Sequence, residues 1–183
     1  MDRLQTESVL LEPLTRDDFP WLFVLYADAE VMRYIGHGPR TEEESRKNLE
    51  WLLGHGERLP FGYWVLRDRA GGERLGGAVL MRRREGTPVE LGFMLARPAW
   101  GRGLATQVAQ ALVVHAFADL VLPELQAFTD VENTASAAVL RKAGMRDAGL
   151  CPGPYGGIDR RFELTRDDWL LQRSSIARLP NMR

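Results

Sequence analysis

The stretch LGFMLARPAWGRGLATQVAQALVV, residues 91–114, decides the fold of this chain. It begins with an apolar run typical of a strand, passes through the turn PAWGRG and continues in a long helical pattern. The two glycines let the backbone turn tightly, so that the N–H groups of residues 102–106 can point into one concavity at the positive end of the helix dipole. This order predicts an anion site, with phosphate as the natural guest and Arg102 as a charge at its rim. A plain strand-to-helix turn is the alternative that these residues alone leave open.

Two common phosphate-binding motifs do not fit this turn. A P-loop needs GxxxxGK followed by Ser or Thr, and the turn has neither that spacing nor the lysine. A dinucleotide fold needs GxGxxG, but the third glycine position is Thr106 and the preceding strands have the pattern of an antiparallel sheet. Both motifs are therefore rejected.

The composition is that of an ordinary globular protein. Its 183 residues, 45% hydrophobic and 27% charged, are enough for one core, and we expect a single domain over residues 1–183. The net charge of −1 gives no support for nucleic acid or an anionic membrane as a partner. The histidines share no metal-ligand spacing, so we expect no metal site.

The sequence also predicts a cytoplasmic location. The only cysteine, Cys151, rules out an internal disulfide and fits a reducing compartment. Residues 1–10 carry charges and no apolar segment, which predicts no signal peptide. The longest uncharged run, residues 104–118, is shorter than the roughly 18–20 apolar residues of a membrane span.

Hydrophobic periodicity predicts a mixed α/β sheet. Thr41 and Glu44 form a capping box that opens an amphipathic helix ending near Gly54. We expect strands at 8–15, 63–67, 74–81, 89–95, 125–130, 145–150 and 160–165, and helices at 15–26, 41–54, 104–118 and 134–143. The middle strands form an antiparallel meander, and the step from 89–95 through the helix at 104–118 to 125–129 is a parallel β-α-β crossover.

A second motif follows that crossover. In ENTASAAVLRKAGM, residues 132–145, Asn133 caps a helix that Gly144 ends. Together, WGRGLAT and NxxSxxVLRKAGM resemble the GNAT N-acetyltransferase superfamily, with its RimJ/RimL-like ribosomal-protein N-terminal acetyltransferases as the nearest branch. The resemblance runs from VLLEPLTRDD to FELTRDDWL, nearly the whole chain. It implies the GNAT fold, acetyl-CoA as co-substrate, and the coenzyme A pyrophosphate as the anion at the glycine turn.

The resemblance also implies which residues bind the cofactor. In this family the strand before the loop lies along the pantetheine arm and hydrogen-bonds to its amides, as an added strand would. A backbone N–H near Met94 would polarise the thioester carbonyl, and Asn133 would help to hold pantetheine. Trp100 is expected to pack under the loop. The cofactor-binding residues are then Phe93, Met94, Leu95, Trp100, Gly101, Arg102, Gly103, Leu104, Ala105, Thr106 and Asn133.

Glu90 and Ser136 are the candidate catalytic residues. On a strand, Glu90, Gly92 and Met94 share one face, and Gly92 leaves room beside Glu90 for an acetyl group and a water. Members of this branch often carry an acidic residue at this position, as a direct or water-mediated base; a solvated glutamate is the alternative. The tyrosine acid of many relatives is replaced by Leu140, and the glutamate of some N-terminal acetyltransferases by Phe128. Ser136, the nearest hydroxyl to the thiolate, is also explained as a small residue packed against the cofactor.

The acceptor site has the weakest sequence signal. In the superfamily, the first two helices and the segment that joins them form one wall of this site. Tyr34, His37 and Tyr155 are therefore candidate acceptor-binding residues. The basic run MRRREG, residues 81–86, lies at a hairpin and is interpreted as a solvated turn rather than as a patch for an acidic substrate.

The sequence thus predicts a transferase that acetylates a primary amine by direct attack in a ternary complex. The acceptor is either a protein N-terminal α-amine or a small-molecule amine, and a homodimer is possible. The competing hypothesis is a non-catalytic acyl-CoA-binding sensor or interaction domain.

Overall fold

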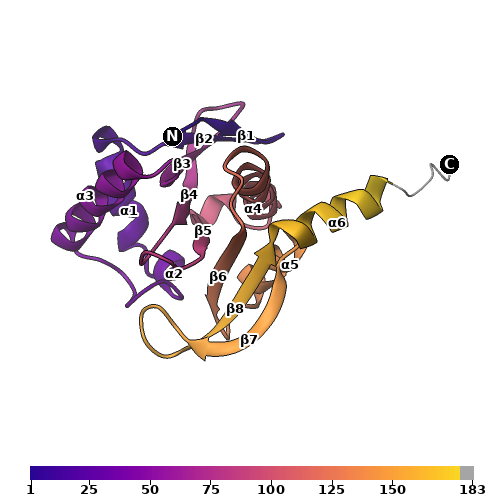
Figure 1. The fold of residues 1–183 in the computed structure, drawn as a ribbon. Helices are drawn as coiled ribbons and strands as arrows, with labels where there is room; N and C mark the ends of the chain where they lie inside the picture. Colours follow the sequence, from indigo (N-terminus) through magenta and orange to yellow (C-terminus); the bar gives the residue numbers. More distant parts are fainter. Residues whose placement is uncertain (178–183) are drawn as a thin grey trace.

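The computed structural model describes residues 1–177. The chain forms one eight-stranded sheet covered by helices (Figure 1). The helical elements are η1 (Arg16–Asp18), α1 (Phe19–Ala27), α2 (Ala29–Met32), α3 (Glu42–Arg58), η2 (Arg97–Ala99), α4 (Leu104–Val114), η3 (His115–Asp119), α5 (Thr134–Lys142) and α6 (Arg166–Ala177). The strands are β1 (Leu4–Gln5), β2 (Val9–Pro13), β3 (Tyr63–Asp68), β4 (Arg74–Met81), β5 (Val89–Leu95), β6 (Glu124–Asp130), β7 (Arg146–Pro152) and β8 (Ile158–Thr165).

The expected mixed sheet is confirmed. Its strand order is β1-β2-β3-β4-β5-β6-β8-β7, antiparallel throughout except for the parallel pair β5 and β6. The helix α4 connects that pair, as the sequence of residues 91–114 predicts. The bounds of β4 and β5 agree with the expected ones, whereas β1, α2 and α6 were not expected. The capping box of Thr41 and Glu44 begins α3, which extends past Gly54 to Arg58.

The two parallel strands, β5 and β6, separate soon after they meet. Their ladder pairs Val89 with Leu125 and Glu90 with Gln126, and no later residues of either strand pair with each other. β5 nevertheless continues to Leu95 and β6 to Asp130. The sheet therefore opens between them, leaving backbone groups of both strands free to bind a ligand.

Each face of the sheet has its own hydrophobic core. On one face Leu91 and Leu95 of β5 pack in the cluster that contains the buried residues of α4 and α5. On the other, Val79 and Met81 of β4 pack with the buried residues of α1, α2 and α3. Met94 joins this second cluster, as expected for a strand whose side chains alternate. The opening between β5 and β6 thus lies between two helical layers, and α6 extends away from the sheet (Figure 1).

Candidate active site

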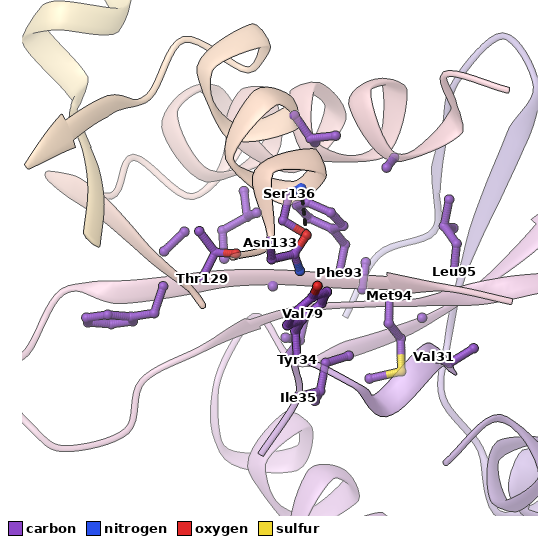
Figure 2. A pocket seen from close by; sticks show the side chains of 18 of the residues that line it. Val31, Tyr34, Ile35, Val79, Phe93, Met94, Leu95, Thr129, Asn133 and Ser136 are labelled. Carbon is purple, nitrogen blue, oxygen red and sulfur yellow. Dashed lines mark hydrogen bonds between the residues drawn. The ribbon is translucent and has the colours of Figure 1, made fainter. Parts of the chain in front are cut away.

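A cavity of about 760 Å³ passes through the opening of the sheet. Its lining comes from β5, β6 and α5, from the glycine turn before α4, and from α2, α3 and the loop between β7 and β8. Figure 2 shows Asn133 and Ser136 on one side of the strands, and Tyr34 and Ile35 on the other. We call the part beside α4 and α5 the cofactor lobe, and the part beside α2, α3 and the β7–β8 loop the acceptor lobe.

The glycine turn forms the outer end of the cofactor lobe. Gly101 and Gly103 have φ values of 71° and 74°, in the left-handed region that glycine enters without strain. The first backbone bonds of α4 are donated by Thr106 and Gln107, both to the carbonyl of Gly103, at 3.1 and 3.2 Å. The N–H groups of residues 101–105 therefore lie before the helical ladder begins, where they suit an anion. Thr106 was expected to be one of these donors, but its N–H already donates to the carbonyl of Gly103 within the helix.

Two side chains of this turn are placed differently from the expectation. The Arg102 guanidinium is not part of the cavity wall; its Nη2 lies 3.2 Å from Asp68 Oδ2. Trp100 is 46% exposed rather than packed under the loop. Its indole Nε1 donates to the carbonyl of Leu95 at 2.8 Å, which holds the turn against the end of β5. Trp100 lines the cavity, and so do the other predicted residues of the turn, which are Gly101, Gly103, Leu104, Ala105 and Thr106.

The backbone of β5 presents alternate residues to the opening. The N–H of Ala96 donates to the carbonyl of Leu75, the residue before Gly76 in β4. The carbonyl of Met94 also points at β4, because a Cβ atom on Gly76 would lie only 2.2 Å from its oxygen. Ala96 and Met94 thus direct their backbone groups towards β4, and Phe93 and Leu95 direct theirs towards the opening. The Leu95 carbonyl is already taken by Trp100. The donors available near Met94 are therefore the N–H groups of Phe93 and Leu95.

Asn133 and Ser136 face these donors from the start of α5. Asn133 Oδ1 accepts from the N–H of Ser136 at 3.0 Å, which is the expected N-cap bond. With its oxygen used in this way, Asn133 retains its Nδ2 group as a donor. Both residues line the cavity, and so does Leu140, at the position where many relatives have tyrosine. Leu140 is 2% exposed and packs in the core beneath α5.

Glu90 lies at the boundary of the two lobes, in a forked ion pair. Arg83 Nε and Nη2 donate to Glu90 Oε2 and Oε1 at 2.5 and 2.8 Å. The guanidinium carbon of Arg83 lies 4.8 Å from the centre of the Tyr155 ring, and Nη2 also donates to the Tyr155 hydroxyl at 3.3 Å. Burial opposes the charge of Arg83, but the bonds and the negative charge of Glu90 outweigh it and raise the pKa of Arg83. Glu90 itself is 7% exposed, so it is not a solvated strand residue.

Two further carboxylates share this face of the sheet. Asp130 of β6 and Asp159 of β8 are paired directly in the antiparallel ladder, and both line the cavity. Burial raises the pKa of Asp159, and the charges of Asp130 and Glu90 raise it further. Three carboxylates therefore lie on this side of the acceptor lobe, where Arg83 pairs with Glu90, while Arg33 and Arg40 line the cavity from the segment after α2.

The predicted acceptor residues are brought together in part. Tyr34 and Tyr155 line the cavity, from the segment after α2 and from the β7–β8 loop. His37 does not line it; its ring packs edge-on against Tyr155, with 6.2 Å between the ring centres. The β7–β8 loop extends towards α2 in Figure 1, which explains how residues so distant in sequence meet.

The sequence interpretation missed Arg83 and Thr129. Arg83 was assigned to a solvated turn, which is wrong: it is half-buried and forms part of the cavity wall. Its place in the hairpin, seven residues before Glu90, was the signal available, because residues on either side of a hairpin turn come close in space. Thr129 of β6 is 6% exposed and lines the cavity, and no sequence pattern marked it.

The described residues contain no group of three or more His, Cys, Asp or Glu side chains arranged to hold a metal ion. Within residues 1–177 no helix is long and apolar enough to cross a membrane.

Comparison with known proteins agrees with this architecture. Residues 8–146 match the family model described as an acetyltransferase (GNAT) domain. The chain is 31% identical, over 96% of its length and 81% of the relative's, to the FsC-acetyl coenzyme A-N(2)-transacetylase of Aspergillus fumigatus.

Solved structures share the fold. An acetyltransferase from Agrobacterium tumefaciens is similar with a TM-score of 0.78 and 26% identity, over 90% of this chain and 94% of that one. A RimL ribosomal-protein acetyltransferase in complex with coenzyme A has a TM-score of 0.77, over 91% and 99% of the two chains; at 17% identity it shows the fold alone. The family match favours an enzyme over a binding module without activity. The chain belongs to the GNAT acetyltransferase family and is an acetyl-CoA-dependent N-acetyltransferase.

Proposed function

We propose that acetyl-CoA binds along the cofactor lobe, with its pyrophosphate at the glycine turn and its thioester at the opening between β5 and β6. The free N–H groups of residues 101–105 suit the pyrophosphate, and those of Phe93 and Leu95 suit the amide and thioester carbonyls. Asn133 Nδ2 supplies a further donor from α5. The observation that carries the proposal is the continuous cavity, which joins this row of donors to Glu90.

The acceptor amine attacks the thioester directly in this proposal. The one cysteine, Cys151, is not part of the cavity wall, so it is not placed to form an acyl-enzyme. Each oxygen of Glu90 accepts one bond from Arg83 and keeps a second lone pair, through which it can bind the ammonium or a water. Glu90 takes the proton that the ammonium must lose before its nitrogen can attack, directly or through water, and the proton that nitrogen loses after the attack leaves through water. Ser136 remains a candidate donor to the leaving sulfur.

We infer that the acceptor is a primary amine that enters as a cation. The four carboxylates that line the acceptor lobe outnumber its three arginines, and a primary ammonium is positive near neutral pH. The carboxylates are Glu30, Glu90, Asp130 and Asp159, and the arginines are Arg33, Arg40 and Arg83. The aromatic rings of Tyr34 and Tyr155 add faces against which a cation or its carbon chain can pack. These features suit a small amine and an exposed protein N-terminus alike, so amines of both classes are to be tested as acceptors.

We propose further that the chain forms one domain over residues 1–183, that it belongs to the RimJ/RimL-like branch, and that it acts in the cytoplasm as a homodimer.

The first experiment is calorimetric titration of the protein with acetyl-CoA, beside the variants Gly103→Asp and Gly103→Asn. Both variants impose the same φ of 74° on a branched side chain of the same shape, but only aspartate adds a negative charge. Asparagine tolerates this conformation best among non-glycine residues, so it serves as the matched control. We expect micromolar binding by the natural protein, weaker binding by Gly103→Asn and no measurable binding by Gly103→Asp.

A second experiment tests whether Glu90 takes part in the reaction. Glu90→Gln should bind acetyl-CoA as the natural protein does, but release coenzyme A thiol more slowly with every amine that the natural protein acetylates. Unchanged turnover would remove Glu90 from the mechanism. Absence of acetyl-CoA binding by the natural protein would contradict the placement of the cofactor lobe.

A further inference from the structure

Thr129 carries a buried hydroxyl that the fold does not use. Its side-chain oxygen has no hydrogen-bond partner among residues 1–177, and the residue is 6% exposed. Buried hydroxyl groups are normally paired, because a lone one loses its bonds to water and gains nothing in return. Valine has the same shape and would fill this place without that cost. The unpaired hydroxyl therefore indicates a partner that the protein alone does not supply.

The position of Thr129 is fixed by the β5–β6 register. The last pair of that ladder is Glu90 with Gln126, so three residues further along each strand Thr129 stands across the opening from Phe93. Thr129 shares its face with Leu125 and Ala127, which pack in the core under α4 and α5. It therefore belongs to the cofactor lobe, four residues before Asn133. Figure 2 shows Thr129 beside Asn133 and Ser136, on the same side of the strands.

We propose that the Thr129 hydroxyl is a catalytic donor to the sulfur of the thioester. This proposal rests on the cofactor placement given above. Where Phe93 offers its N–H to the carbonyl from one side of the opening, Thr129 stands on the other side, next to the departing sulfur. In the reaction the amine nitrogen bonds to the acetyl carbon, the carbon–sulfur bond breaks and its electron pair stays on sulfur. The Thr129 hydroxyl stabilises that charge by a hydrogen bond and keeps its own proton, while the amine protons leave through Glu90 and water.

The free protein lets the hydroxyl turn towards the ligand. Because Oγ1 has no partner, no hydrogen bond holds the side chain in its present rotamer. Rotation about the Cα–Cβ bond exchanges the hydroxyl with the methyl group, and threonine populates more than one such rotamer. The donor thus becomes paired only when the thioester or thiolate is in place. This supplies the function that the tyrosine of many relatives would have at the position of Leu140.

The test uses coenzyme A itself as the probe, because its thiol reports the interaction without knowledge of the acceptor. The ultraviolet absorbance of the thiolate is followed against pH for coenzyme A bound to the natural protein, to Thr129→Val and to Thr129→Ser, with the protein alone as the blank for Cys151. We expect the thiol to ionise roughly one pH unit lower on the natural protein than on Thr129→Val, a tenfold change in thiolate fraction. Thr129→Ser, which keeps the hydroxyl, should restore the natural value.

Two further readouts separate a catalytic donor from a structural residue. With the amine that the natural protein acetylates fastest, we expect kcat to fall on the order of 100-fold in Thr129→Val and to recover in Thr129→Ser. The melting temperature of ligand-free Thr129→Val should equal or exceed that of the natural protein, because the variant removes an unpaired hydroxyl. Ser136→Ala removes the other candidate hydroxyl of this lobe and shows which of the two residues donates to the sulfur.

The outcomes are distinct. Identical thiol titration and turnover for the natural protein and Thr129→Val would overturn the proposal. A changed titration in Ser136→Ala but not in Thr129→Val would also overturn it, because the donor would then be Ser136. Failure of the natural protein to bind coenzyme A would instead contradict the cofactor placement itself.

Discussion

Asn133 shows how one residue can serve both the fold and the site. Its side-chain oxygen caps α5, and its amide nitrogen remains available to a ligand in the cofactor lobe. The two roles involve different atoms, so different substitutions separate them. Serine is as good an N-cap as asparagine but lacks the amide donor, whereas alanine lacks both.

We therefore expect Asn133→Ser to retain the stability of the natural protein and to weaken acetyl-CoA binding about tenfold, the effect of one lost hydrogen bond of roughly 1.4 kcal/mol. Asn133→Ala should weaken binding similarly and also lower the free energy of unfolding by about 1 kcal/mol. Calorimetric titration and chemical denaturation give the two quantities. Equal acetyl-CoA affinity in all three proteins would show that the amide donates nothing to the cofactor.

The residues that sequence alone could identify are those whose role is local. Thr41 with Glu44, Gly103 before α4 and Asn133 before α5 act within a few residues of their own position, and the structure places each in the expected turn or cap. Arg83 and Thr129 act across strands, and their significance depends on which residues the register brings opposite them. The carboxylate Asp159 is another such case, because its neighbour Asp130 lies on a different strand.

At the scale of elements, local signals again decide what is predictable. The strands β4 and β5 are bounded by turn residues and have long apolar runs, so their ends follow from the sequence. The helix α6 lacks a broad apolar stripe, since Leu170 and Leu171 are exposed and Trp169 is the buried residue of its first turns. Its signal was Thr165 at the start of the helix, whose hydroxyl accepts from the N–H of Asp168 at 3.2 Å and donates to the Asp168 carboxylate at 2.7 Å. The short strand β1 has no signal of its own beyond its pairing with β2.

The start of α1 is attached to the sheet by one buried carboxylate. Asp18 is 4% exposed; it accepts from the backbone and hydroxyl of Thr15 at 3.1 and 2.9 Å, and its Oδ1 lies 2.9 Å from Arg74 and 3.3 Å from Arg67. Burial acts to raise the pKa of Asp18, but the bonds from Arg74 and Thr15 outweigh it, so the pKa is lowered. Because Tyr26 at the far end of α1 lines the acceptor lobe, this attachment also positions the acceptor wall.

A lowered carboxyl pKa stabilises the fold above its unfolded value of about 3.9, and that stabilisation disappears as the pH falls through the folded value. We expect Asp18→Asn to lose about 2 kcal/mol of unfolding free energy at pH 7. The difference from the natural protein should shrink once the pH falls below about 4. Urea denaturation at several pH values measures it, and Asp17→Asn, the same change at an exposed neighbour, is the control. A difference that is constant with pH would contradict the assigned ion pairs.

At the scale of the whole molecule, the cofactor site is part of the sheet. The opening lies between β5 and β6 inside the sheet, and the cavity that passes through it is lined by residues of both hydrophobic cores. A ligand that fills this space binds only the folded chain and should therefore stabilise all of it.

Acetyl-CoA at about 100 times its dissociation constant should raise the unfolding free energy by roughly 2.7 kcal/mol. For a chain of this size, that corresponds to an increase in melting temperature of roughly 5–10 °C. Differential scanning calorimetry with and without acetyl-CoA measures the shift. Gly103→Asp should show none, and a similar shift in that variant would mean that the ligand stabilises the protein from another site.

The contact between Arg83 and Tyr155 has a mechanical consequence. The sheet consists of two plates, β1 to β5 and β6 to β8, that share only two rungs of backbone pairing. The loop that carries Tyr155 follows β7 and so belongs to the second plate. Arg83 lies in the β4–β5 hairpin of the first plate and contacts Tyr155, so a side-chain contact joins the two plates in addition to the β5–β6 ladder. The same guanidinium therefore holds Glu90 and connects the two plates of the sheet beside the acceptor lobe.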